Sequence, residues 1–103
     1  MRRLVGLRPS AGTTWPPEVR SAIRTRDRWC VAVRANFPLS PNFPNCAGTL
    51  EVDHVRASGG LGLKSRSTLD NGVLLCSRHH RWRTEHGREA RPLLLAYLER
   101  VAA

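Results

Sequence analysis

Apolar and polar positions along the chain follow two different periods, and each period predicts its own kind of element. At residues 17–27 the apolar side chains recur at the spacing of one helical face. Pro16 and Pro17 mark the start of this helix, because a first helical turn tolerates proline. Residues 48–54 alternate apolar and acidic side chains, and residues 72–76 form a short apolar run, so both segments are predicted strands. The pattern turns helical again over 77–87 and over 92–102.

The segments between these elements carry turn and loop signals. Residues 31–45 contain three prolines and are predicted to be irregular, and a glycine-containing loop is expected between the two strands. Residues 1–14 are arginine-rich without periodicity, which predicts a basic flexible arm. Trp15 and Trp29 are expected in the core. The prediction is a single α+β domain over residues 15–103, with two strands and flanking helices.

Charge points to a polyanionic partner. The 103 residues include 17 Lys and Arg against 8 Asp and Glu, for a net charge of +9, which favours nucleic acid as the partner. No apolar run is long enough to span a membrane, and the N-terminal apolar stretch is too short for a signal peptide. We therefore expect a cytoplasmic protein with no membrane partner.

Three cysteines and a neighbouring histidine form a candidate zinc site. An odd number of cysteines cannot all pair within one chain, and Cys76 and His79 have the C-x-x-H spacing of a chelating hook at a strand-to-helix junction. Cys30 and Cys46 are the other cysteines available, so the prolines between them must let the chain double back. The resulting Cys3His set predicts a structural zinc ion, which would supply folding free energy to a small core.

A second group of residues has the chemistry of a hydrolytic site. Asp53 offers a hard oxygen to a divalent cation, and His54 is able to accept a proton from water near neutral pH. Neighbours on a strand point to opposite faces, so the two share a site only if the strand bends at its end. His79 and His80 lie about 100° apart on a helix, so His79 can face the zinc while His80 faces Asp53.

The segments LEVDHV and LDNGVLLCSRHH, with the flanking cysteines, resemble the HNH endonuclease family, specifically its small zinc-stabilised members from phages and bacteria. The resemblance covers about residues 19–85, and the three namesake positions would be His54, Asn71 and His80. It implies a ββα-metal finger over about residues 48–86. It also implies that Asp53 and His80 coordinate a catalytic Mg²⁺ or Mn²⁺, that His54 is the general base, and that Asn71 holds the loop orienting His54.

Two departures from the family pattern concern the zinc site. The usual C-x-x-C before the first strand is stretched to Cys30 and Cys46, and the second C-x-x-C is here C-x-x-H. In an alternative assignment, Cys76 and His80 bind zinc and His79 faces the catalytic ion. We favour His79 as the zinc ligand because it occupies the position of the family's second cysteine.

The expected substrate is DNA, and the expected reaction is hydrolysis of its phosphodiester bonds. Basic residues on the long loop and on the second helix are the predicted DNA contacts: Arg56, Lys64, Arg66, Arg78, Arg81 and Arg83. The family resemblance also suggests a bacterial or phage-infected cell and a partner such as a phage terminase or other DNA-processing machinery. The competing interpretations are a non-catalytic zinc-knuckle DNA-binding module and an accessory subunit of a larger DNA-processing complex.

Overall fold

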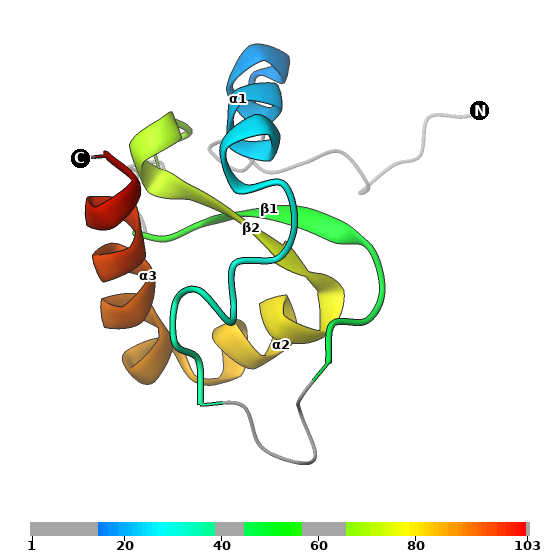
Figure 1. The fold of residues 1–103 in the computed structure, drawn as a ribbon, viewed down its shortest axis with the longest axis vertical. Coiled ribbons are helices and arrows are strands. Elements are labelled where there is room, and N and C mark those ends of the chain that lie inside the picture. Colours follow the sequence, from blue (N-terminus) through cyan, green and yellow to red (C-terminus); the bar gives the residue numbers. More distant parts are fainter. Residues whose placement is uncertain (1–14, 39–44, 57–65, 103) are drawn as a thin grey trace, which may run out of the picture.

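The computed structural model describes residues 15–38, 45–56 and 66–102 (Figure 1). The predicted arm 1–14 and Lys64, a predicted DNA contact, lie outside these ranges. Over the described residues the chain forms a helix, a strand, a short 3₁₀ turn, a second strand and two helices. The α+β class predicted from the sequence is confirmed.

The first helix, α1, spans Pro17–Asp27 as predicted. Its first turn is closed by the carbonyl of Pro16, which accepts hydrogen bonds from Val19 and Arg20 at 3.0 Å each. Proline fits there because its missing N–H would have had no partner within the helix. Ile23 is fully buried, so α1 contributes its predicted apolar face to the core.

Trp29 is exposed, and its predicted place in the core is wrong. Arg28 ends α1 with a left-handed φ of 69°, which turns the chain sharply. The turn leaves Trp29 62% exposed and brings Cys30 and Val31 inward. The Val31 amide then donates a hydrogen bond to the carbonyl of Leu74 at 2.9 Å, which fixes this segment against the second strand.

The two strands form an antiparallel hairpin. Strand β1, Leu50–His54, pairs with β2, Gly72–Cys76, so that Leu50 lies opposite Cys76 and His54 opposite Gly72. β1 begins at Leu50, after the predicted start at residue 48, because Gly48 adopts a φ of +85° that interrupts an extended chain.

The hairpin separates two buried clusters. Val52 and Leu74 pack with Trp15 and Ile23 on the face toward α1. Val73 and Leu75 belong to a larger cluster on the other face, with residues of the 30–37 segment and of the third helix. Side chains that alternate along β1 therefore meet two different environments.

Helix α2, Ser77–Glu85, follows β2 without a linker. Cys76 is its N-cap, and the Cys76 sulfur accepts a hydrogen bond from the amide of His79 at 3.4 Å. This arrangement places His80 against β1 and the adjacent His79 against the 30–37 segment, on two sides of α2.

Helix α3 spans Gly87–Ala102, so the predicted boundaries 92–102 are wrong at the N-terminal end. The Ala90 amide donates to the carbonyl of His86 at 2.9 Å, which closes a first turn well before Pro92. Pro92 lies on the exposed side, where its missing N–H removes one helical hydrogen bond. Ala90 is completely buried, so the turn before Pro92 contributes to the core. None of the described helices has both the length and the apolar character needed to cross a membrane.

Candidate functional site

The three cysteines and His79 converge from distant parts of the chain. Their ligand atoms all lie within 4.8 Å of one another. The Nδ1 atom of His79 lies 3.1 Å from the sulfur of Cys76, 3.4 Å from that of Cys30 and 3.7 Å from that of Cys46. Tetrahedral zinc with ordinary bond lengths would hold sulfur and nitrogen about 3.5 Å apart. The four side chains could therefore bind a metal ion, as the sequence predicted.

The thiols in this cluster ionise unequally. Burial raises the pKa of Cys30, and burial together with the two neighbouring thiols raises the pKa of Cys46 to about 12. Burial is the largest influence on Cys76 and opposes its ionisation, but the hydrogen bonds from the amides of His79 and Ala47 and from the two other thiols together lower the pKa of the Cys76 thiol. Packing several thiolates together requires a compensating positive charge, which a divalent cation supplies.

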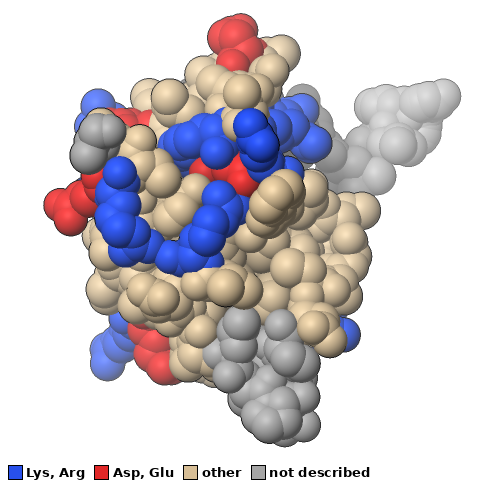
Figure 2. Space-filling model, viewed as in Figure 1, with Lys and Arg blue, Asp and Glu red and all other residues tan. Residues whose placement is uncertain are grey.

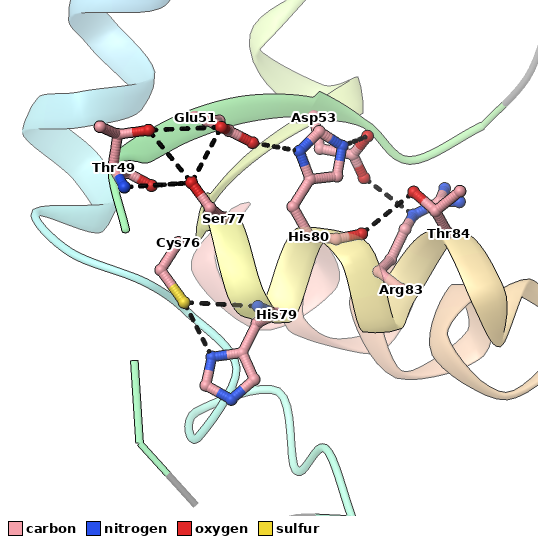
Figure 3. Close-up of polar contacts among 9 residues, drawn as sticks. All are labelled: Thr49, Glu51, Asp53, Cys76, Ser77, His79, His80, Arg83 and Thr84. Carbon is pink, nitrogen blue, oxygen red and sulfur yellow. Dashed lines mark hydrogen bonds and ion pairs between the residues drawn. The ribbon is translucent and has the colours of Figure 1, made fainter. Parts of the chain in front are cut away.

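A separate site lies where α2 crosses β1. The His80 imidazole lies between two carboxylates of β1, with Nε2 3.1 Å from Asp53 Oδ1 and Nδ1 2.6 Å from Glu51 Oε1 (Figure 3). The hydrogen bond to Asp53 and then that to Glu51 raise the pKa of His80 to about 9, although burial opposes this. The hydrogen bond from His80 also lowers the pKa of Glu51.

Arg83 completes the contacts of Asp53. Its Nε lies 2.8 Å from Asp53 Oδ2, and both side chains are 13% exposed. The same guanidinium donates hydrogen bonds to the carbonyls of His54 at 3.0 Å and Val55 at 2.7 Å. Arg83 was predicted as a DNA contact, but its guanidinium is engaged inside the domain, where it fixes the end of β1 against α2.

No known protein family, curated protein or solved structure shows significant similarity to this chain. The function of the protein is therefore inferred from its own residues and their geometry.

His54 lies on the opposite face of β1 from Asp53. Its ring stacks on Trp15, with centroids 4.2 Å apart and planes inclined by 18°, and its Nε2 lies 2.9 Å from Ser67 Oγ. Gly72 makes room for this packing, since a Cβ there would come within 2.5 Å of the Trp15 ring. Burial lowers the pKa of His54, although Asp53 opposes the shift. The structure thus brings Asp53 and His80 together and places His54 on the other side of the strand end.

Asn71 ties the two ends of the loop between the strands. Its Oδ1 accepts a hydrogen bond from the Arg56 amide at 2.8 Å, and its Nδ2 donates to the carbonyls of Arg66 at 2.8 Å and Arg56 at 3.3 Å. Its backbone carbonyl also accepts from the Val55 amide at 3.0 Å. Asn71 is buried. It therefore closes the described ends of this loop just after His54.

The remaining predicted DNA contacts in the described chain are exposed: Arg56, Arg66, Arg78 and Arg81. Figure 2 shows a further group of basic side chains on one face, around the end of α1 and beside α3. Three arginines of the described chain are linked by contacts of their own. Arg100 donates a hydrogen bond to the carbonyl of Arg34, and the Arg34 guanidinium donates to the carbonyl of Asp27, whose carboxylate pairs with Arg26. Spacing along the chain does not group these three residues.

Sequence reasoning missed Glu51 as a member of the His80 site. The strand alternation did place Glu51 on the same face as Asp53, and that was the available signal. A shallow groove of about 280 Å³ adjoins this side of His80 and is lined by Glu51, Ser77, His80, Arg81 and Thr84. The groove places Arg81, an exposed cation of α2, beside the candidate site.

Proposed function

We propose that this chain is a zinc-stabilised, divalent-metal-dependent endonuclease of the HNH type that hydrolyses DNA phosphodiester bonds. In this proposal β1, β2 and α2 form the ββα-metal finger, and Asp53 and His80 hold the catalytic ion. The supporting observation is the 3.1 Å separation of Asp53 Oδ1 and His80 Nε2, two donors from elements far apart in the sequence.

The donor set fits a hard divalent ion. Two adjacent ligands of an octahedral Mg²⁺ lie about 3.0 Å apart, close to the separation of these two atoms. One carboxylate and one imidazole would leave most coordination positions to water and to phosphate oxygens, as is usual for Mg²⁺. When bound, the ion would polarise a phosphoryl oxygen and stabilise the charge that develops on the leaving oxygen.

His54 is proposed as the general base. Its lowered pKa, caused by burial, keeps the imidazole neutral near pH 7 and able to accept a proton from water. In an in-line displacement the attacking and leaving oxygens lie on opposite sides of phosphorus. The proposal therefore requires the phosphate to lie beyond the end of β1, with His54 on one side of it and the Asp53–His80 pair on the other.

Asn71 and the basic residues have supporting roles in this proposal. Asn71 would hold Arg56 and Arg66, at the two described ends of the loop after His54, and so limit movement of the base. Arg56, Arg66, Arg78 and Arg81 would contact phosphates, in keeping with the net charge of +9.

The proposal is tested by incubating plasmid DNA with the zinc-loaded protein and Mg²⁺ or Mn²⁺, with an EDTA control. We expect metal-dependent nicking or cutting that is lost in Asp53→Ala, His80→Ala and His54→Ala. The His54→Ala variant should keep its DNA affinity and zinc content. Cleavage by His54→Ala at the parental rate would refute the general-base role, and equal cleavage by all three variants would refute the site.

A non-catalytic zinc-dependent DNA-binding module is the second candidate. It is favoured by the ion pairs that already satisfy Asp53 and His80 through Arg83 and Glu51, and by the stacking of His54 on Trp15. This function predicts salt-dependent DNA binding with no cleavage under any divalent ion, and the plasmid assay separates the two.

A further inference from the structure

The His80 imidazole has a carboxylate at each of its two nitrogens. Asp53 lies at Nε2 and Glu51 lies at Nδ1, at 3.1 and 2.6 Å respectively. The two nitrogens occupy opposite edges of the ring. An ion held by Asp53 and Nε2 would therefore lie on the far side of the ring from Glu51, so Glu51 has a different task from that of a ligand.

Glu51 is itself held in place. Its Oε2 accepts hydrogen bonds from Ser77 Oγ at 3.0 Å and from Thr49 Oγ1 at 3.3 Å (Figure 3). Ser77 Oγ also accepts from the Thr49 amide at 3.0 Å, which fixes the hydroxyl between β1 and α2. The carboxylate facing His80 thus has a defined position set by two neighbouring hydroxyls.

A metal-bound imidazole must present a lone pair on the coordinating nitrogen and carry its proton on the other. An ionised carboxylate only accepts hydrogen bonds, so Glu51 requires a proton on Nδ1. We propose that Glu51 is a positioning residue that keeps the proton on Nδ1 of His80 when an ion beside Asp53 displaces the Nε2 proton to solvent, so that the Nε2 lone pair is directed at the ion. This inference rests on the proposed function, because it presumes an ion at Asp53 and His80.

The proposal is tested with Glu51→Gln in the full-length, zinc-loaded protein. Glutamine keeps the size of the side chain, but its amide can donate to Nδ1 as well as accept from it, so the preference for one tautomer is lost. We expect Mn²⁺ binding, measured by titration calorimetry, to weaken by about 10–100-fold. We also expect the Nδ1–H proton resonance of His80 in the Mg²⁺-saturated protein to move upfield, because the amide oxygen of glutamine accepts a weaker hydrogen bond than a carboxylate does.

Two further variants keep the test decisive. Ser77→Ala removes a hydrogen bond to Glu51 and should weaken Mn²⁺ binding by a smaller factor than Glu51→Gln does. This variant provides the test if Glu51→Gln folds poorly. Glu99→Gln makes the same chemical change at an exposed position of α3 and should leave Mn²⁺ binding unchanged. Zinc content and thermal unfolding report the fold of each variant.

The outcomes separate this inference from the proposed function. If the parent protein binds Mn²⁺ through Asp53 and His80 but Glu51→Gln binds it equally well with the Nδ1–H resonance unchanged, the positioning role is refuted and the ion site stands. A loss of stability in Glu51→Gln without a change in Mn²⁺ affinity or in the Nδ1–H resonance would also refute it. If the parent protein binds no Mn²⁺ at Asp53 and His80, both proposals fail.

Discussion

The hydroxyl of Tyr97 donates a hydrogen bond to the carboxylate of Asp27 at 2.6 Å, inside the core between α3 and α1. Asp27 is completely buried, and its other partners are the Arg26 guanidinium at 2.7 Å and the Leu74 amide at 3.0 Å. One carboxylate thus joins α1, β2 and α3. A buried charge is tolerated only where it is paired and hydrogen-bonded in this way, so each partner should matter for stability.

Replacing Tyr97 by phenylalanine should destabilise the domain by about 1–3 kcal/mol, because it removes a donor from a buried charged acceptor. Urea unfolding of the zinc-loaded protein measures the change. Leu95→Met, a swap of similar volume at a partly buried position of the same helix, is the control and should cost less. Equal stability of Tyr97→Phe and the parent would mean that Asp27 gains nothing from the hydroxyl.

The hydrogen bond between Tyr97 and Asp27 also predicts that the stability of the domain depends on pH in the alkaline range. Burial, and then the hydrogen bond to Asp27, raise the pKa of Tyr97 from 10.0 to about 12, so the folded protein favours the neutral phenol. The stabilisation is therefore fully present below pH 10 and is lost as the pH rises through about 12. The chain has a single tyrosine, so tyrosinate absorbance reports Tyr97 alone. A midpoint near 10 in the folded protein would contradict this.

Gly48 should be intolerant of any side chain. Its φ is +85°, and a Cβ there would lie 2.6 Å from the Cβ of Ser77. Gly48→Ala should destabilise the domain by about 1–3 kcal/mol, because both the backbone and the contact are strained. Gly87→Ala is the matched control: nothing lies within 4 Å of its Cβ position at the start of α3, so its stability should change by less than about 1 kcal/mol. Thermal unfolding of the two variants compares them directly, and equal losses would refute the argument.

Local patterns were sufficient to predict most of the elements. Helix 17–27, the strand at 72–76 and the helix that follows it were predicted because each carries a periodicity or a proline signal within its own residues. The sequence predicts the start of α3 too late, because a proline is typical of a first helical turn, whereas the buried Ala90 favours a start one turn earlier. Trp29 was placed wrongly because a left-handed Arg28 has no marker in the sequence.

The candidate site residues likewise include some that the sequence identifies and others that only the fold brings together. Cysteine number was enough to select Cys30, Cys46 and Cys76, since the chain has no other cysteine, whereas the choice of His79 over His80 depended on the family resemblance. The chain contains several other glutamates and arginines, and only the packing of α2 against β1 brings Glu51 to His80 and Arg83 to Asp53. Contacts of this kind depend on tertiary structure, which local periodicity does not encode.

Zinc removal should unfold much of the domain, because Cys30, Cys46, Cys76 and His79 join three separated segments. Metal analysis of the purified protein should give an equimolar amount of zinc, and a strong chelator should abolish cooperative thermal unfolding. His79→Ala should lose zinc, whereas His80→Ala should retain it. Retention of zinc by His79→Ala together with its loss from His80→Ala would reverse the assignment of the two histidines.

Arg81 and Arg83 should behave differently when each is replaced by alanine, although both lie on α2 and both were predicted to contact DNA. Arg81 is exposed beside the groove, so Arg81→Ala should weaken DNA binding and reduce the slope of log affinity against log salt by about 1. The thermal stability of Arg81→Ala should equal that of the parent protein. Fluorescence anisotropy with a labelled duplex over a range of salt concentrations measures the slope.

Arg83→Ala should instead lower stability, because it removes the counter-ion of Asp53 and the donor to two carbonyls at the end of β1. The expected loss is about 1–3 kcal/mol, and the salt slope of DNA binding should remain that of the parent. A reduced slope without loss of stability would show that Arg83 leaves Asp53 to contact phosphate. In that case the ion pair would be a resting arrangement that DNA displaces, and Asp53 would be released toward the ion when DNA binds.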